Sequence, residues 1–209
     1  MTAPQLPDPV YVILDRSVGR GRALEALLEA VIAGGGRLVQ LREKEWSLAA
    51  LWPVAERLRR RCREAGVTFI VNDRVDLALA LEADGVHLGQ DDLPGPLARR
   101  LLRPGMLLGL STHDAAQARA AVEAGADYVA VGSMYPTGTK PAFQLVGPEL
   151  VRRVRPDVPV PLVAIGGITE ANVAPVVEAG ADAVAVISAV CAAPDPAAAT
   201  RGLLAALAH

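Results

Sequence analysis

Short apolar segments of four or five residues recur along the chain and alternate with longer segments in which apolar residues lie three or four positions apart. The short segments have the length of a buried strand, and the longer ones have the period of an amphipathic helix. The predicted strands are Val10–Leu14, Leu38–Leu41, Thr68–Val71, Gly85–Leu88, Leu107–Leu110, Tyr128–Val131, Leu162–Ile165 and Ala183–Ile187. Eight strands that alternate with helices in 209 residues are typical of a compact (β/α)8 barrel, an α/β fold.

The helical segments support the same fold. The clearest follows the second strand, with Leu51 and Leu58 on its apolar face and Arg59 on the opposite face. The other predicted helices are Arg22–Ala33, Val75–Glu82, Pro96–Leu102, Asp114–Ala124, Pro148–Val154, Thr169–Glu178 and Pro196–Leu207. An open doubly wound sheet is the alternative fold, but the first strand lacks the Gly-x-Gly-x-x-Gly turn that best supports it. We expect a single domain over residues 1–209, with residues 1–9 as an extended, proline-rich lead-in.

One internal repeat favours the barrel. Residues 123–131 have the sequence EAGADYVAV, and residues 178–186 have the sequence EAGADAVAV. Residues 81–88, LEADGVHL, are a weaker third copy. Each copy is expected to hold a helix end, a glycine at or near its C-cap, an aspartate in the turn and then a buried strand.

Composition and charge exclude several classes of protein. The formal net charge is −2 and aromatic residues make up 3%, whereas nucleic-acid binding usually needs a basic excess or exposed aromatic rings. Cys62 and Cys191 lie far apart without a Cys-x-x-Cys motif, so we predict packed thiols rather than a zinc site or a disulfide. The chain has no apolar run of membrane-spanning length and no signal-peptide pattern at its start. We therefore expect a cytoplasmic protein without nucleic-acid or membrane partners.

The active site of such a barrel lies where the strands end and the following loops begin. After the second strand, Gln40, Arg42 and Lys44 share one face, which suits an anionic group with several oxygens. Asp73 and Asp92 follow the third and fourth strands, and neighbouring strand ends bring such carboxylates together, so we predict that they hold Mg2+. The alternatives are an exposed charged turn for the first group and helix N-capping for a single aspartate.

Three further loops carry candidate residues. Ser111 ends the fifth strand, and His113 is a candidate acid or base whose alternative is a structural or exposed histidine. The loop after the sixth strand offers phosphate donors and a permissive glycine within Thr137–Lys140. Gly166–Gly167 and Ser188 follow the last two strands, where these barrels usually bind phosphate through backbone N–H groups.

The two predicted anion sites differ in chemistry. A cationic, metal-assisted site suits a pyrophosphate leaving group, whereas a plain phosphate group needs no metal. The difference indicates a transfer between two phosphorylated small-molecule substrates, one of which loses pyrophosphate.

In order and spacing, these motifs resemble those of the thiamine phosphate synthase (thiamine-phosphate pyrophosphorylase) family, from residue 11 to about residue 190. The motifs are Gln40–Lys44, Asn72–Arg74, Gly85–Asp92, Gly109–Ser111, Tyr135–Lys140, Gly166–Ile168 and Ile187–Ser188. The resemblance implies a (β/α)8-barrel transferase that joins 4-amino-2-methyl-5-hydroxymethylpyrimidine diphosphate to a thiazole phosphate, giving thiamine phosphate and pyrophosphate. With a carboxylated thiazole, CO2 is also lost. For the assembly, only the frequency of dimers among soluble enzymes favours a homodimer.

The resemblance also implies roles for individual residues. The pyrimidine diphosphate site maps onto Gln40, Leu41, Arg42, Glu43, Lys44, Asn72, Ser111 and Lys140. The thiazole phosphate site maps onto Thr137, Gly138, Thr139, Gly167, Ile187 and Ser188, and the Mg2+ ligands map onto Asp73 and Asp92. In the family's dissociative mechanism the diphosphate leaves first, and the thiazole nitrogen captures the pyrimidine-methyl cation. The residues expected to stabilise the leaving group, and so to be catalytic, are Arg42, Lys44, Ser111 and Lys140.

Two positions depart from the family pattern, namely Leu14 where Thr is usual and Ser133 where Pro is common, and neither is an assigned ligand position. The nearest alternative is a thiazole tautomerase of the same fold, which generally lacks the aspartate pair and uses a loop histidine, here His113. A non-catalytic phosphate-binding barrel is the other alternative, but such a protein has no need of a metal-binding pair beside cationic residues.

Overall fold

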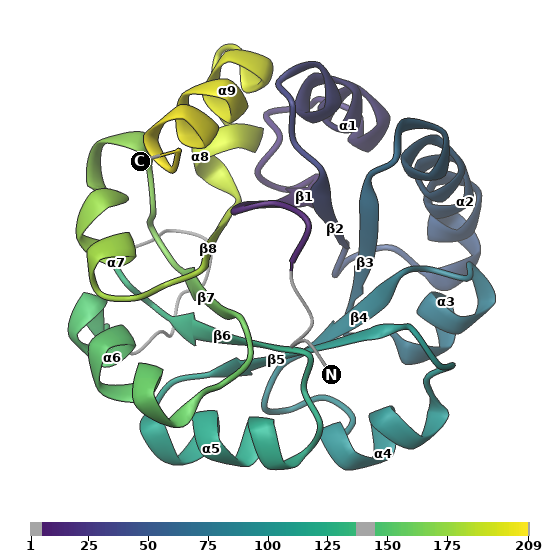
Figure 1. Cartoon of the computed structure of the whole chain (residues 1–209). Helices are drawn as coiled ribbons and strands as arrows, with labels where there is room; N and C mark the ends of the chain where they lie inside the picture. The colour runs from purple at the N-terminus through teal and green to yellow at the C-terminus, as the bar shows by residue number, and fades with distance from the viewer. Residues whose placement is uncertain (1–5, 137–144, 209) are drawn as a thin grey trace.

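The computed structural model describes residues 6–136 and 145–208. Within these ranges, eight parallel strands pair in chain order, and β8 pairs with β1 to close the barrel. The strands are β1 (Val10–Asp15), β2 (Leu38–Arg42), β3 (Thr68–Asn72), β4 (Gly85–Leu88), β5 (Leu107–Thr112), β6 (Tyr128–Gly132), β7 (Leu162–Ile165) and β8 (Ala183–Val186). This closed ring with helices around it (Figure 1) confirms the predicted (β/α)8 barrel and excludes the open sheet.

Helices carry the chain from one strand to the next along the outside of the barrel. They are α1 (Leu24–Ala33), α2 (Leu48–Ala65), α3 (Val75–Ala80), α4 (Gly95–Leu101), α5 (Ala115–Glu123), α6 (Gly147–Val154), α7 (Ala174–Glu178), α8 (Ser188–Cys191) and α9 (Pro196–Ala206), with 3-10 turns η1 (Arg155–Asp157) and η2 (Glu170–Asn172). Three of these helices begin where a side chain accepts a backbone N–H of the first turn, at Ser47, Asp114 and Asp195.

The structure differs from the prediction after β7 and after β8. The predicted helix over residues 169–178 is divided into η2 and α7. Thr169 and Asn172 form a capping box around η2, and α7 then begins separately at Ala174. Pro175 lies in the first turn of α7, where its missing N–H costs nothing, whereas inside one continuous helix it would remove a hydrogen bond. Helix α8 was not predicted, because four residues carry too little periodicity.

Side chains that alternate along each strand divide the core into two parts. One part packs between the sheet and the helices and includes Val12, Leu14 and Val39. The other fills the barrel interior and consists of Tyr11, Ile13, Leu38, Ile70, Tyr128, Ala130, Val163, Ala183 and Ala185. Leu6 packs against this second part, and residues 6–9 lie across one opening of the barrel (Figure 1). Polar residues that follow these interior-facing side chains at alternate positions along the strands therefore gather toward the opposite opening.

The sequence repeat builds the amino-terminal end of the barrel. The aspartates of the three copies each accept a backbone N–H from a strand, in the pairs Asp84 with Phe69, Asp127 with Leu108 and Asp182 with Leu162, at 2.7–2.8 Å. Gly125 and Gly180 have φ values of 81° and 103°, as expected for a left-handed cap. In the third copy the expected glycine cap is wrong, because Glu82 takes that place with a φ of 51° while Gly85 begins β4.

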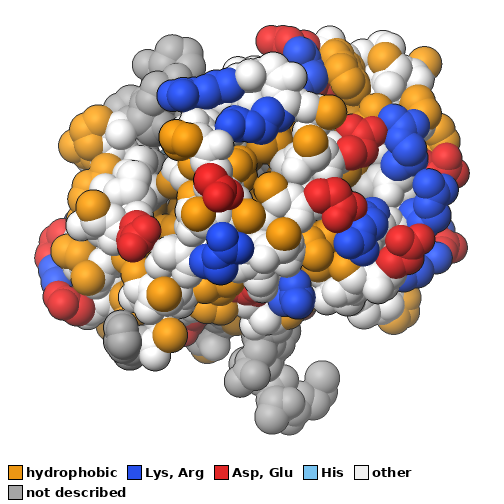
Figure 2. Space-filling view, turned by 90° about the horizontal axis from the view of Figure 1, so that it is seen from above, with side chains coloured by type: hydrophobic (Ala, Val, Ile, Leu, Met, Phe, Trp, Pro, Cys, Tyr) orange, Lys and Arg blue, Asp and Glu red, His pale blue; other side chains and the backbone are white. Residues whose placement is uncertain are grey.

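The outer surface carries charges of both signs. Figure 2 shows Lys and Arg side chains interspersed with Asp and Glu over one face. Between α1 and α2, ion pairs join Arg57 to Glu25 and Arg61 to Glu29 at 2.7 and 2.6 Å. In the described part of the chain, no helix is long and apolar enough to cross a membrane.

Candidate active site

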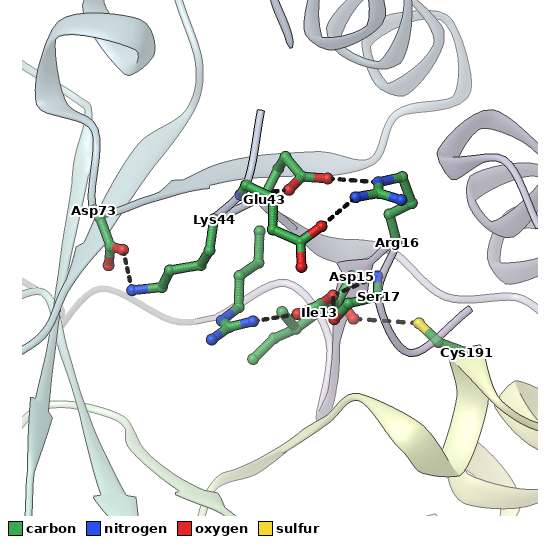
Figure 3. Close-up of polar contacts among 10 residues, drawn as sticks. Ile13, Asp15, Arg16, Ser17, Glu43, Lys44, Asp73 and Cys191 are labelled. Carbon is green, nitrogen blue, oxygen red and sulfur yellow. Dashed lines mark hydrogen bonds and ion pairs between the residues drawn. The ribbon is translucent and has the colours of Figure 1, made fainter. Parts of the chain in front are cut away.

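A buried ion pair lies at the carboxyl ends of β1 and β2. Asp15 and Arg42 are opposite each other in the strand register, and Arg42 Nη1 donates to Asp15 Oδ2. The side chain of Asp15 is 4% exposed, and its Oδ1 accepts the backbone N–H and the hydroxyl of Ser17 at 2.9 and 2.6 Å (Figure 3). Arg42 has five N–H donors and uses one in this pair, so the pair fixes a guanidinium that retains donors for an anion.

Lys44, Asp73 and Asp92 follow the neighbouring strands β2, β3 and β4. Lys44 Nζ lies 2.6 Å from Asp73 Oδ2 (Figure 3). Asp73 has a φ of 62°, a left-handed conformation that aspartate tolerates better than most residues, and its N–H donates to the carbonyl of His87 on β4. Asp92 Oδ2 accepts the N–H of Gly89 at 2.7 Å. The backbone thus holds both predicted metal ligands in place.

The pKa of the Asp92 carboxyl is raised above its ordinary value. Partial burial is the largest cause, and the neighbouring carboxyl of Asp73 acts in the same direction, whereas the N–H of Gly89 and the charge of Lys44 oppose them. A carboxyl whose pKa is raised by a neighbouring carboxyl repels that neighbour when ionised, and a cation between the two relieves the repulsion. The predicted aspartate pair is therefore assembled in the structure, and its occupation by Mg2+ stays a prediction.

Two residues predicted at the diphosphate site have side chains that are engaged elsewhere. Leu41 is buried in the layer between sheet and helices, so its side chain does not face the barrel interior. Glu43 is nearly buried and accepts from Arg16 Nε at 3.0 Å (Figure 3). Arg16 also pairs with Glu45 and lies 5.0 Å from the ring centre of Trp46. A ligand contact at Leu41 or Glu43 would therefore come from the backbone.

The remaining predicted residues of this site belong to interior-facing rows. Gln40 is 1% exposed, and its amide donates to the phenol of Tyr11 at 2.7 Å. Ser111 is half-buried near the end of β5, and Asn72 is half-buried at the end of β3, in register with His87. The barrel therefore brings Gln40, Asn72 and Ser111 to the same side of the sheet, as the alternation predicts.

Sequence reasoning missed His87 and Asp15. The imidazole of His87 is buried, with Nε2 at 2.8 Å from Ser111 Oγ and Nδ1 at 3.1 Å from the hydroxyl of Tyr128. A Ser–His pair is part of a hydrolase triad, but here the group beyond the histidine is a phenol and not a carboxylate. Their positions could have indicated both residues, because each is an interior-facing polar residue near the end of a strand.

The backbone after β7 and β8 has positive-φ glycines and a helix start at the predicted phosphate site, whose occupation stays a prediction. Gly166 and Gly167 have φ values of 107° and 63°, and a Cβ on Gly166 would lie 2.0 Å from Ser133 Oγ. Ile187 precedes α8, which begins at Ser188, and the first N–H groups of a helix have no acceptor within it. The remaining residues predicted here, and the predicted catalytic lysine, lie outside the described residues: Thr137, Gly138, Thr139 and Lys140.

His113, the candidate base for the tautomerase alternative, has a structural place. Its Nδ1 lies 2.7 Å from the carbonyl oxygen of Gly132, and its backbone N–H donates to Gln117 Oε1 at 2.8 Å. A carbonyl only accepts, so Nδ1 carries the proton in this contact. The ring therefore ties the loop after β5 to the end of β6.

Comparisons with known proteins agree on one family. A model of the thiamine monophosphate synthase family matches residues 10–190. The chain is 51% identical over 195 residues to a thiamine-phosphate synthase of Chloroflexus aurantiacus, across 93% of this chain and 90% of that protein. It is 49% identical over 195 residues to one of Moorella thermoacetica, across 93% of each. The solved thiamine phosphate pyrophosphorylase from Pyrococcus furiosus matches with a TM-score of 0.87 at 36% identity, over 95% of this chain and 94% of that chain. The chain belongs to the thiamine monophosphate synthase family.

Proposed function

We propose that this transferase joins 4-amino-2-methyl-5-hydroxymethylpyrimidine diphosphate to a thiazole phosphate, giving thiamine phosphate and pyrophosphate. One observation carries the proposal: a guanidinium fixed by the buried Asp15 lies on the same strand end as Lys44 and beside a paired set of carboxylates. This arrangement suits a diphosphate with a divalent cation far better than a single phosphate. The relatives named thiamine-phosphate synthase support the same product.

The residues of β2 act on the leaving group. When the bond between the pyrimidine methylene and the diphosphate oxygen breaks, the electron pair and a negative charge move onto the diphosphate. Arg42 and Lys44 stabilise that charge, and because the pair with Asp15 already orients Arg42, little reorganisation is needed. The pyrimidine amino group stabilises the cation left behind. Departure before attack needs no covalent nucleophile, consistent with a His87–Ser111 pair that has a phenol in place of the carboxylate.

Asp73 and Asp92 would hold Mg2+. The Asp92 carboxyl lies beside that of Asp73, and its pKa is raised by partial burial and by this neighbour, which supports a cation between the two carboxylates. Mg2+ in proteins is often bound by one or two carboxylates together with water and substrate phosphate oxygens, and two carboxylates are the ligands proposed here. When bound, the ion supplies two positive charges to the diphosphate oxygens.

The loops after β7 and β8 orient the second substrate. The backbone at Gly167 and the start of α8 at Ser188 bind the phosphate of the thiazole, so that its ring nitrogen faces the pyrimidine methylene. A single phosphate at this subsite needs no metal, because N–H and hydroxyl donors can hold it. A homodimer stays a prediction.

The test is a two-substrate assay of pyrophosphate release with purified protein. We expect release only when the pyrimidine diphosphate, the thiazole phosphate and Mg2+ are all present, together with an equal amount of thiamine phosphate. Release at the same rate without the thiazole would show a diphosphatase, and no release would exclude the synthase. Isomerisation of the thiazole phosphate that is lost in His113→Ala would instead support the tautomerase.

A further inference from the structure

A chain of hydrogen bonds between side chains crosses the barrel interior. Gln40 Nε2 donates to the Tyr11 hydroxyl at 2.7 Å, and that hydroxyl lies 2.9 Å from the hydroxyl of Tyr128. The Tyr128 hydroxyl lies 3.1 Å from His87 Nδ1, and His87 Nε2 lies 2.8 Å from Ser111 Oγ. The first four side chains are buried and Ser111 is half-buried. The interior chain therefore links β2 to β5 through the centre of the barrel.

The number of protons gives the interior chain a direction. Either hydroxyl could donate between Tyr11 and Tyr128, but Tyr11 already accepts from the Gln40 amide. Because a buried hydroxyl proton needs an acceptor, we direct the proton of Tyr11 to the Tyr128 oxygen. The proton of Tyr128 is then directed to His87 Nδ1, which must accept. A neutral imidazole that accepts at Nδ1 carries its proton on Nε2, and this N–H donates to Ser111 Oγ. The hydroxyl proton of Ser111 is left to donate away from His87.

Both phenols keep their protons in this arrangement. Burial raises the pKa of Tyr11 and of Tyr128 well above the ordinary value of a phenol. The two rings meet edge to face with centres 5.9 Å apart, and the His87 ring stacks on Tyr128 at 5.6 Å. A Cβ on Gly109 would lie 2.0 Å from Tyr128 Cζ, which explains why the Gly109–Ser111 motif begins with glycine. Packing therefore holds the Tyr128 ring in one orientation.

We propose that Tyr11 and Tyr128 are positioning residues that hold His87 in its Nε2–H tautomer, so that Ser111 presents its hydroxyl proton to the departing diphosphate. The role of Ser111 rests on the proposed function, but the tautomer does not. The opposite direction, with the proton of His87 on Nδ1, would turn the Ser111 proton toward Nε2 and leave only its oxygen lone pairs for the substrate. A hydrogen-bond acceptor that faces the departing diphosphate would repel its negative charge and oppose its departure.

The tautomer is measured by nitrogen-15 NMR of protein labelled at histidine, with the His87 signals assigned by their loss in His87→Asn. In the unaltered protein we expect the Nε2–H tautomer. In Tyr128→Phe, His87 loses its donor at Nδ1, and we expect a mixture of tautomers and a kcat about ten times lower, with the KM of the thiazole phosphate changed less than twofold. Tyr135→Phe is the matched control for the spectrum, because it removes a phenol that donates to the Asn172 carbonyl outside the interior chain.

The Nδ1–H tautomer in the unaltered protein would overturn the proposal without any variant. An unchanged tautomer or an unchanged kcat in Tyr128→Phe would also overturn it. Should that variant fail to fold, Tyr11→Phe breaks the same chain one step earlier and is judged by the same two readouts. A protein that shows the Nε2–H tautomer but releases no pyrophosphate would contradict the proposed function and leave the tautomer assignment standing.

Discussion

The two ends of the barrel use the same residue type for opposite purposes. At the amino-terminal end, Asp127 accepts from the Leu108 N–H at 2.7 Å and from Arg99 at 2.8 Å, both through Oδ2. At the carboxyl-terminal end, Asp92 accepts one N–H and lies beside a second carboxyl, that of Asp73. The first aspartate is neutralised by the chain itself, whereas the second pair is short of positive charge. A cationic ligand can neutralise a carboxylate charge that the surrounding residues leave uncompensated.

The largest expected effect is at Asp92. In Asp92→Ala, pyrophosphate release should fall about 100-fold or more and lose its dependence on Mg2+, because one of the two carboxylates for the ion is gone. The thermal unfolding midpoint should not fall, since the substitution also relieves the repulsion with Asp73. Asp91→Ala, at the exposed neighbouring carboxylate, is the control. Equal losses in both variants would show that only the summed charge matters.

A smaller effect is expected at Asp15, which acts through Arg42. Asp15→Asn keeps an oxygen for Ser17 but removes the charge that orients the guanidinium. We expect kcat/KM for the pyrimidine diphosphate to fall about tenfold, with the KM of the thiazole phosphate unchanged. Steady-state kinetics with each substrate varied in turn would check this. A loss that appears in both KM values would point to general unfolding rather than to positioning.

At the other end of the barrel, Asp127→Ala should act on stability alone. It leaves the Leu108 N–H and the Arg99 guanidinium without their shared acceptor, so the free energy of unfolding should fall by about 2 kcal/mol. The activity of the folded fraction should stay within twofold of the original. Denaturant unfolding followed by the two-substrate assay measures both quantities. An activity loss at constant stability would remove the distinction between the two ends.

The pH dependence of stability should report on Asp92 as well. The pKa of Asp92 is raised in the folded protein, so the folded state binds this proton more tightly than the unfolded state does. The two states therefore differ in protonation between the unfolded pKa of about 4 and the raised pKa. Without metal, the free energy of unfolding should therefore fall as the pH rises through the raised pKa. In Asp92→Ala this fall should be smaller. A series of unfolding curves in the absence of divalent ions would show whether the two proteins differ.

The smallest effect is expected for a substitution at Cys62. Burial raises the pKa of its thiol to about 12, so the native protein should react with a thiol reagent at pH 8 far more slowly than the unfolded chain. Cys62→Ala should cost about 1 kcal/mol of stability and leave turnover within twofold. A large loss of turnover would assign the thiol a role that the site geometry does not indicate.

The limits of the sequence analysis are clearest at the strand ends. The predicted first strand stops at Leu14, because the apolar run ends there, whereas β1 continues through Asp15. The backbone ladder does not depend on side-chain polarity, so β1 pairs Asp15 with Arg42 of β2. His87 was missed because it is a polar residue inside an otherwise apolar strand, so the apolar pattern did not single it out. Periodicity therefore found the strands and several interior-facing polar residues, but it missed Asp15 and His87 among them.

The sequence by itself determined the order of strands and helices, the aspartate pair after β3 and β4, and the glycines of the loops predicted to bind phosphate. Each of these depends on local patterns, such as the side-chain period or a glycine that must adopt a positive φ. Only the tertiary structure decided which atoms the repeat aspartates contact, for example the Leu108 N–H at Asp127. It also decided the contacts of Arg42 with Asp15, of Ser111 with His87 and of Tyr11 with Tyr128, whose partners lie 27, 24 and 117 residues apart. Such pairs form only when the closed barrel brings neighbouring or opposite strands into register, and no local pattern encodes that closure.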